Sequence, residues 1–316
     1  MLAPIVLFTY NRPKHTAKVL QSLKQNALSK QSMLFIYSDA PKNHKDRHKV
    51  LRTRQYLKAF QKRYKDSFQD IKIIEREYNL GLAESIIDGV THIINNYKKI
   101  IVLEDDILVS PVFLNYMNDA LSRYENNKNV WAINAYTPPI NPSGLGDCFF
   151  WYFPDPWGWG TWSDRWQYFR RDADYFIQSF SKQEIFEINL KNSYNAWQQI
   201  LLNKKGKIKT WAIFFYCLAY KHKALSLTPS VSYIQQIGLD GSGIHCSPFE
   251  EVFNPKTINM KFPISYPSEI RVLDIAIQKY YKFFKSIKIS FLARVKRKIQ
   301  TIYKHFKTQT LPHPKN

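Results

Sequence analysis

Five short apolar runs recur through the first 135 residues, and helical periodicity follows each of the first four. Short apolar runs bounded by turn signals are typical of strands buried on both faces. The runs are Ile5–Phe8, Leu34–Tyr37, Ile71–Ile74, Ile100–Leu103 and Val130–Ile133, and the helical stretches are Thr16–Leu28, Asp46–Tyr64, Ala83–Tyr97 and Pro111–Tyr124. This alternation predicts an α/β fold with a mostly parallel sheet flanked by helices. Pro111 suits the first turn of the fourth helix, with Ser110 as its N-cap.

The pattern changes after about Tyr136. A stretch rich in Pro, Gly and Trp gives way to a helical region at Lys182–Asn203 and a strand-like run at Ala224–Val231. We therefore expect residues 1–135 to form one α/β half, residues 136–268 a second half of the same domain, and residues 269–316 a basic tail.

Polar residues cluster where the predicted strands end. The first strand leads into Thr9 to Pro13, the second into Ser38-Asp39, the third into Asn79 to Leu82, and the fourth into Glu104-Asp105-Asp106. Parallel sheets bind ligands at this edge. Three adjacent carboxylates repel one another, so they must be solvated, paired or bound to a cation such as Mg²⁺ or Mn²⁺. A solvated turn without function is the alternative interpretation.

Several function classes are disfavoured by missing motifs. The sequence contains neither G-x-x-x-x-G-K-[ST] nor a G-x-G-x-x-G after the first strand, which argues against a P-loop ATPase and a dinucleotide oxidoreductase. The three cysteines are widely spaced, which indicates neither a zinc site nor a disulfide framework and fits a reducing, cytoplasmic compartment. We expect no signal peptide. The longest apolar run, Trp211 to Tyr220, is shorter than the ~20 residues of a spanning helix.

Positive charge is concentrated at the C-terminal end. The formal net charge is +21, and eleven Lys and Arg but no acidic residue follow Asp274. Apolar residues recur there at helical spacing, among them Phe284, Ile287 and Phe291. A basic amphipathic helix predicts contact with an anionic membrane surface, here the inner face of the cell membrane. A helix packed on the domain with a solvated basic face is the alternative.

A glycine-rich loop lies between Ile237 and His245. Its backbone N–H groups, with Ser242 and the His245 imidazole, could close over phosphates. An ordinary turn is the alternative.

The motifs together resemble one enzyme family. The order Thr9-Tyr10-Asn11-Arg12-Pro13, Ser38-Asp39, Asn79-Leu80-Gly81-Leu82-Ala83 and Val102-Leu103-Glu104-Asp105-Asp106 resembles nucleotide-sugar glycosyltransferases of the GT-A type, bacterial family-2-like enzymes related to N-acetylglucosaminyltransferase I. Trp157 to Trp162 and Gly238 to Cys246 continue a resemblance that covers about residues 3–250.

The resemblance implies roles for individual residues. Asp106 would ligate Mn²⁺ (or Mg²⁺) on the donor diphosphate. The nucleotide sugar, most simply a UDP-sugar, would be bound by Thr9, Arg12, Asp39, Asn79, Glu104, Asp105, Ser242 and His245. The cleft for the acceptor would be shaped by Trp157, Trp159, Trp162 and Trp211.

The catalytic base is where this sequence departs from the family. Related enzymes place an Asp after a Trp, whereas Trp211 is followed by Ala212. Asp155 and Asp240 are the remaining candidates, and Asp155 could equally be a turn residue between two prolines.

The implied activity is an inverting transfer of a hexosyl or N-acetylhexosaminyl group to a glycan or lipid-linked acceptor. The expected setting is synthesis of bacterial surface polysaccharide, either lipopolysaccharide or capsule. Two rival interpretations are a basic nucleic-acid-binding protein and a catalytically inactive sugar-nucleotide-binding module. The absence of a helix-turn-helix or RNP pattern makes a nucleic-acid partner unexpected.

Overall fold

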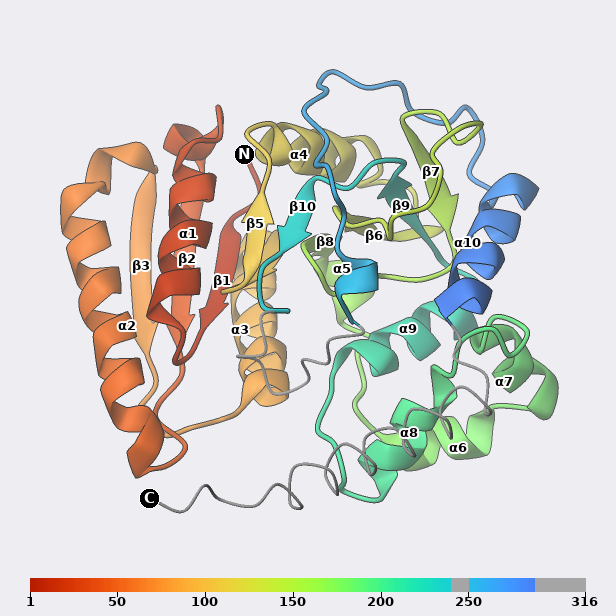
Figure 1. The fold of residues 1–316 in the computed structure, drawn as a ribbon, viewed down its shortest axis with the longest axis horizontal. Coiled ribbons are helices and arrows are strands. Elements are labelled where there is room, and N and C mark those ends of the chain that lie inside the picture. Colours follow the sequence, from red (N-terminus) through yellow and green to blue (C-terminus); the bar gives the residue numbers. More distant parts are fainter. Residues whose placement is uncertain (240–249, 288–316) are drawn as a thin grey trace, which may run out of the picture.

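The computed structural model describes residues 1–239 and 250–287 (Figure 1). An eight-stranded sheet runs through the molecule in the order β3-β2-β1-β4-β8-β6-β9-β7, with helices on both faces. Its strands are β1 (Ile5–Thr9), β2 (Met33–Ser38), β3 (Asp70–Glu75), β4 (Lys99–Glu104), β6 (Val130–Asn134), β7 (Cys148–Trp151), β8 (Trp159–Trp162) and β9 (Leu225–Pro229). The predicted α/β fold with a mostly parallel sheet is confirmed.

The predicted strands become β1, β2, β3, β4, β6 and β9. Neighbours among β3, β2, β1 and β4 pair in parallel, as do β6 and β9. The sequence did not reveal β8, which lies between β4 and β6 and is antiparallel to both. Strands β4 and β6 therefore run in the same direction, and their carboxyl ends share one edge of the sheet.

Glycine allows β8 to occupy this central position. A β-carbon on Gly160 would lie 2.9 Å from the carbonyl oxygen of Ile100 on β4 and 3.1 Å from the Met117 side chain on the covering helix. Any larger residue would force the helix or the neighbouring strand to move. A second, two-stranded sheet pairs β5 (Ile107–Val109) with β10 (Ile234–Gln236) in antiparallel fashion.

Four helices confirm the helical stretches predicted in the first half: α1 (Pro13–Lys24), α2 (His44–Arg63), α3 (Leu82–Tyr97) and α4 (Phe113–Arg123). The predicted start of α4 was wrong. Residues 111 and 112 form a turn, Val112 is the N-cap, and no side chain caps the helix. The Ser110 carbonyl accepts a hydrogen bond from the Phe113 N–H at 3.0 Å, so Ser110 contacts the start of α4 through its backbone and not through its hydroxyl.

The second half adds α5 (Ser163–Trp166), α6 (Ala173–Ser179), α7 (Lys182–Ile188), α8 (Trp197–Lys204) and α9 (Ala212–Lys221). The helical region predicted at 182–203 is two helices. It breaks at Leu190, Lys191 and Asn192, which all adopt positive φ angles that an α-helix cannot contain. In the described part of the chain, no helix has both the length and the apolar character that crossing a bilayer requires.

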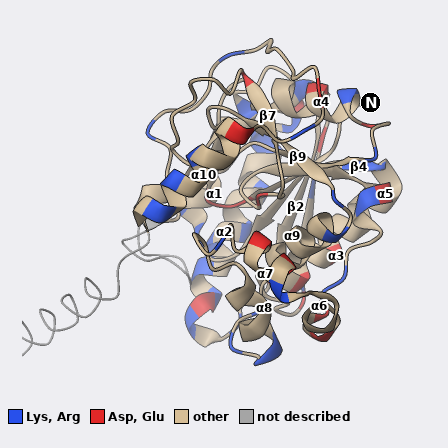
Figure 2. Ribbon diagram, turned by 90° about the vertical axis from the view of Figure 1, so that its right-hand side faces the viewer, with Lys and Arg blue, Asp and Glu red and all other residues tan. Residues whose placement is uncertain are grey.

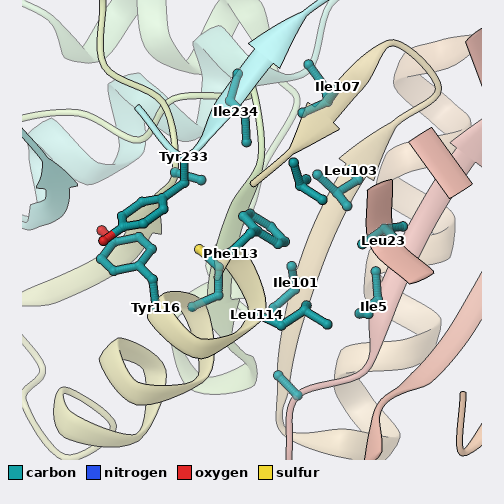
Figure 3. Close-up of a cluster of buried hydrophobic side chains, with 14 of the residues drawn as sticks. Ile5, Leu23, Ile101, Leu103, Ile107, Phe113, Leu114, Tyr116, Tyr233 and Ile234 are labelled. Carbon is teal, nitrogen blue, oxygen red and sulfur yellow. The ribbon is translucent and has the colours of Figure 1, made fainter. Parts of the chain in front are cut away.

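Each face of the sheet carries its own core. On one face α1, α2 and α4 pack with β5 and β10, and Figure 3 shows Ile101 and Leu103 of β4 beside Phe113 and Leu114 of α4. Tyr116 and Tyr233 stack there with ring centroids 4.5 Å apart. On the other face α3 packs beside the aromatic-rich helices of the second half. Strands buried on both faces explain why the early apolar runs show no alternation.

The last described helix, α10 (Asp274–Ile287), packs on the domain. Tyr280 stacks on Trp151 of β7 at 3.9 Å between ring centroids, and Phe284 lies 4.9 Å from the Tyr194 ring. Phe284 therefore contacts protein, although the sequence pattern assigned it to a membrane-facing side. Residues 288–316, which hold most of the predicted amphipathic segment, lie outside the described residues.

Candidate active site

The carboxyl ends of β1 and β4 bring Arg12 to the acidic triplet. These strands are parallel neighbours with Phe8 opposite Glu104, so the segments that follow them emerge side by side. The Arg12 guanidinium lies 2.5 Å from Asp105 Oδ1 and 2.8 Å from Asp106 Oδ2. The Tyr10 N–H donates to Asp105 Oδ2 at 3.2 Å. Arginine thus pairs two of the three carboxylates.

Burial dominates the electrostatics of this cluster. The pKa of Glu104 is raised to about 8, chiefly by burial and also by the neighbouring Asp106 and Asp105, whereas Arg12 opposes the shift. Burial also raises the pKa of Asp105 to about 6, although Arg12 opposes this shift. Burial lowers the pKa of Arg12, but Asp105 and Asp106 outweigh this effect and raise the pKa above its ordinary value. Burial and the two neighbouring carboxylates therefore both favour the protonated form of Glu104.

Among the described residues, one oxygen of Asp106 has no hydrogen-bond partner. Asp106 is 7% exposed, and within the described part of the chain no group hydrogen-bonds to its buried Oδ1. A buried carboxylate oxygen without a partner is costly in a native protein unless a ligand, a water or an ion satisfies it. Hard divalent cations prefer such oxygen ligands, so the residue fits Mg²⁺ or Mn²⁺.

The described residues offer no complete metal cage. Across residues 1–239 and 250–287, no group of three or more His, Cys, Asp and Glu side chains is arranged to hold a metal. A cation at Asp106 would need most of its ligands from substrate oxygens and water, which is how Mg²⁺ usually binds in phosphate sites.

The segment after β10 covers the acidic cluster. Gln236 pairs with Ile107 across the small sheet, and the Ile237 N–H donates to the Asp106 carbonyl at 2.8 Å. A β-carbon on Gly238 would lie 2.2 Å from Asp106 Oδ2 and 2.9 Å from the Arg12 guanidinium. Only glycine permits this approach, so the glycine-rich loop predicted over the phosphates begins directly above Asp106.

Asp39 anchors the loop that follows β3. Its two carboxylate oxygens accept hydrogen bonds from the N–H groups of Leu80 and Gly81, at 3.0 and 2.9 Å, and from Asn79 Nδ2 at 3.0 Å. The sequence placed Asp39 and Asn79 at the nucleotide. The structure brings the two together, and Asp39 orders the turn in which Gly81 adopts a φ of 74° before α3.

Thr9 lies at the end of β1. It is 4% exposed, and its hydroxyl donates to the Tyr37 carbonyl at 3.2 Å. Thr9 therefore holds β1 and β2 together below the expected nucleotide pocket.

Asp155 lies at the same edge of the sheet. Its N–H donates to Asn134 Oδ1 at 2.9 Å, at the end of β6, and its Oδ1 accepts the Trp157 N–H at 3.0 Å. Burial raises its pKa to about 7, against the lowering effect of the Trp157 N–H. A carboxyl held in place with a pKa near neutrality suits a general base. Asp240, Ser242 and His245 lie outside the described residues.

Three of the four tryptophans expected in the acceptor cleft are core residues. Trp159 and Trp162 on β8 are 1% and 2% exposed, and Trp211 at the start of α9 stacks on Trp159 at 5.0 Å between ring centroids. The cleft assignment was therefore wrong for these three, because an unpredicted strand takes two of them into the core. Trp157 is partly exposed and packs edge-on against Tyr136, 4.7 Å between centroids, beside Asp155.

The sequence did not point to several residues outside the motifs that hydrogen-bond to the segments at the carboxyl edge of the sheet. Asp46 of α2 accepts hydrogen bonds from Tyr10 Oη at 3.0 Å and Asn11 Nδ2 at 2.9 Å. His15 Nε2 lies 3.1 Å from the Ile237 carbonyl oxygen. Gln236 Oε1 accepts the Gly238 N–H at 2.8 Å. The partners of Tyr10, Asn11 and His15 are distant in the sequence, and no local pattern marks them.

No protein-family model and no curated protein matches this sequence. Among solved structures, S. aureus TarS residues 1–349 is similar at a TM-score of 0.42 and 12% identity, over 74% of this chain and 60% of that one. A longer TarS structure has a TM-score of 0.33 and 15% identity, over 43% of this chain and 22% of that chain. UDP-glucose pyrophosphorylase complexed with UDP-glucose has a TM-score of 0.35 and 10% identity, over 72% of this chain and 90% of that one. The chain thus spans less than two thirds of the TarS structures it matches.

Proposed function

We propose that this protein is an inverting glycosyltransferase of the GT-A type that uses a nucleotide-diphosphate sugar, most simply a UDP-sugar. The observation that carries the proposal is the buried Oδ1 of Asp106 beside Arg12, at the carboxyl edge of a mostly parallel sheet, to which no group among the described residues hydrogen-bonds. An arginine and an available carboxylate oxygen suit a diphosphate with its cation. The motif order Tyr10-Asn11-Arg12, Asp39 and Glu104-Asp105-Asp106 supports the same assignment.

On the donor side, Asp106 would hold the Mn²⁺ or Mg²⁺ ion through its available oxygen. When bound, the cation supplies charge neutralisation for the leaving diphosphate. Asp105 keeps Arg12 oriented, because the guanidinium and the Tyr10 N–H occupy its two oxygens. The loop that continues from Gly238, including Ser242 and His245, would order over the diphosphate.

On the acceptor side, we assign Asp155 as the base in preference to Asp240. Ionised Asp155 would take the proton from the acceptor hydroxyl as its oxygen bonds to the anomeric carbon. The bond from that carbon to the diphosphate oxygen breaks on the opposite side, which inverts the centre. Asn134 and the Trp157 N–H fix the carboxyl, and the partly exposed Trp157 ring offers a flat surface to the acceptor sugar.

A binding module without transfer is the main rival, because Ala212 replaces the family's aspartate. Trp211 is packed on Trp159 in the core, so this segment contributes to the fold whether or not the protein is an enzyme. Release of free sugar from UDP- and GDP-sugars, measured in the presence of Mn²⁺, separates the two: a binding module releases none.

The donor site is tested with Asp106→Asn and a matched surface control, Asp66→Asn. Ligand at about 100 times its Kd stabilises a fold by about 2.7 kcal/mol, which a thermal shift detects. We expect a UDP-sugar with Mn²⁺ to raise the Tm of the wild type and the control, and not that of Asp106→Asn. Donor hydrolysis that is unchanged in Asp106→Asn would contradict the metal assignment.

A membrane role for the tail, with a lipid-linked acceptor for lipopolysaccharide or capsule at the inner leaflet, is part of the proposal. Because α10 packs on the domain through Tyr280, the informative truncation begins after Ile287. Eight Lys and Arg follow that residue. We expect the truncated protein to bind anionic liposomes less tightly, and undiminished binding would count against the tail.

A further inference from the structure

Most of the net positive charge outside the tail lies on one helix and the residues beside it. Between Lys42 and Lys65 the chain carries ten Lys and Arg and one acidic residue, Asp46. The rest of the first 274 residues is close to neutral, with 25 basic and 24 acidic residues. Segment 42–65 therefore accounts for nearly all of the excess charge before the tail, and it includes the whole of α2.

The structure turns this charge outward. Val50, Thr53, Leu57 and Phe60 form the buried side of α2. The rest of the helix surface exposes Lys45, Arg47, Lys49, Arg52, Lys62 and Arg63, which we term the α2 basic face. With 20 residues, α2 is about 30 Å long.

Nearby acidic groups leave this face largely uncompensated. Both oxygens of Asp46 accept hydrogen bonds from Tyr10 and Asn11, at the end of β1. Glu75 lies 3.0 Å from Lys58 and 3.7 Å from Arg54, neither of which belongs to the α2 basic face. Arg54 is turned inward, where it donates to the carbonyls of Ser38 and Arg76.

The position of α2 allows contact with a large surface. It is the outermost element at one end of the long axis, whereas α10 lies at the other end (Figure 1). In Figure 2, viewed from the opposite end of that axis, Lys and Arg lie among Asp and Glu on the helices of the second half. Opposite charges pair there, as in Lys204 with Asp174 and Lys221 with Glu184. An excess of positive charge is thus concentrated at the α2 end.

We propose that the α2 basic face docks on an anionic lipid leaflet. Leu51 lies within this face and is 47% exposed, and an apolar side chain flanked by Lys and Arg suits the headgroup boundary. Single-stranded nucleic acid is the less suitable partner, because it needs exposed rings for stacking. The two tyrosines of the segment, Tyr56 and Tyr64, are partly buried and pack on Phe60. This surface does not depend on the proposed reaction.

Charge reversal in the full-length protein tests the proposal. The test variant combines Lys49→Glu, Arg52→Glu and Lys62→Glu on α2. The matched control combines Lys205→Glu, Lys207→Glu and Lys209→Glu, which changes the same charge in the exposed segment between α8 and α9. Both variants keep the tail, and retained Tm values verify that both are folded. Binding is measured by co-sedimentation with vesicles of about one part phosphatidylglycerol to three parts phosphatidylcholine.

We expect the α2 variant to bind these vesicles roughly a hundredfold more weakly than the wild type, because each basic residue adds attraction near an anionic leaflet. The control should remain within a fewfold of the wild type, and pure phosphatidylcholine should bind none of the three proteins. Equal losses in both variants would overturn the proposal, as would no vesicle binding by the wild type. An α2-dependent affinity for a single-stranded RNA that exceeds the affinity for vesicles would also overturn it.

Discussion

Gly238 and Asp106 approach so closely that a β-carbon on the glycine would lie 2.2 Å from Asp106 Oδ2. This contact joins the segment after β10 to the acidic triplet after β4. It explains why residue 238 is a glycine, since this residue lies directly against Asp106, the candidate ligand of the cation. The two residues are 132 positions apart, and the antiparallel pairing of β5 with β10 brings them together.

Gly238→Ala should therefore disturb the site. The added methyl group must displace Asp106 or lift the covering segment, and overpacking of this kind typically costs about 1–3 kcal/mol. We expect a lower free energy of unfolding and at least tenfold weaker binding of a UDP-sugar with Mn²⁺, measured by denaturation and calorimetry. Gly206→Ala is the control, because nothing lies within 4 Å of its β-carbon position and only its positive φ is strained. Donor affinity that is unchanged in Gly238→Ala would contradict the close approach.

The rate of sugar transfer should rise with pH. Asp155 has a pKa of about 7 because it is buried, and only its ionised form can accept a proton. We expect kcat/KM to increase up to about pH 7 and then level off. Asp155→Asn keeps an oxygen for the Trp157 N–H but removes the base, so kcat should fall by about 10²–10⁴ with donor binding retained. A flat pH profile in the wild type would argue for a different base.

The same group should make stability depend on pH. The folded-state pKa of Asp155 lies above its ordinary value of 3.8, so the unfolded chain releases this proton first. Its contribution is fully present below about pH 4 and is lost as the pH rises to about 7. Asp155→Asn should therefore lose less stability than the wild type between these values, as measured by urea denaturation. Parallel curves for the two proteins would show that the carboxyl is not buried as described.

Asp39→Asn should loosen the turn before α3. The amide group replaces one acceptor oxygen, which leaves N–H donors of residues 79–81 unpaired, and hydrogen bonds to charged groups are worth about 1.5–3 kcal/mol. We expect a loss of about 2–4 kcal/mol in the free energy of unfolding. Asn79→Ala removes the amide that donates to Asp39 Oδ2 and, at 2.7 Å, to the Ala40 carbonyl, but it keeps the Leu80 and Gly81 N–H bonds to Asp39, so it should cost only about 1–2 kcal/mol. Equal losses in the two variants would contradict an anchoring role for Asp39.

Trp159 and Trp157 should respond differently to truncation. Trp159 is 1% exposed and its ring packs against Trp166, Trp211 and Phe215, so Trp159→Ala should destabilise the fold by about 3–5 kcal/mol. Trp157→Ala should cost less stability and mainly raise the KM for the acceptor. Thermal denaturation and steady-state kinetics separate the two effects. A raised acceptor KM with unchanged Tm in Trp159→Ala would restore Trp159 to the cleft.

Local pattern was sufficient for the elements of the first half. The strands around Ile5–Phe8 and Ile100–Leu103 and the helices between the runs are confirmed, because hydrophobic period and strand length are local properties. The meeting of Arg12 with the acidic triplet also followed from the general rule for parallel sheets. Strand β8 could not be predicted, because Gly160 and its neighbouring tryptophans become a strand only by pairing with β4 and β6.

The sequence by itself thus determined an α/β fold, an edge carrying Arg12, Asp39 and the acidic triplet, and a strongly uneven charge distribution. Only the tertiary structure decided which groups these residues contact. In the structure, Asp39 anchors the loop after β3, and Trp159 and Trp162 lie in the core. Asp155 lies at the same edge of the sheet as Asp106, and most of the basic residues of α2 are exposed to solvent. The reason is that pairing partners, burial and the direction of a helix face depend on residues distant in the sequence, whereas strand and helix periods do not.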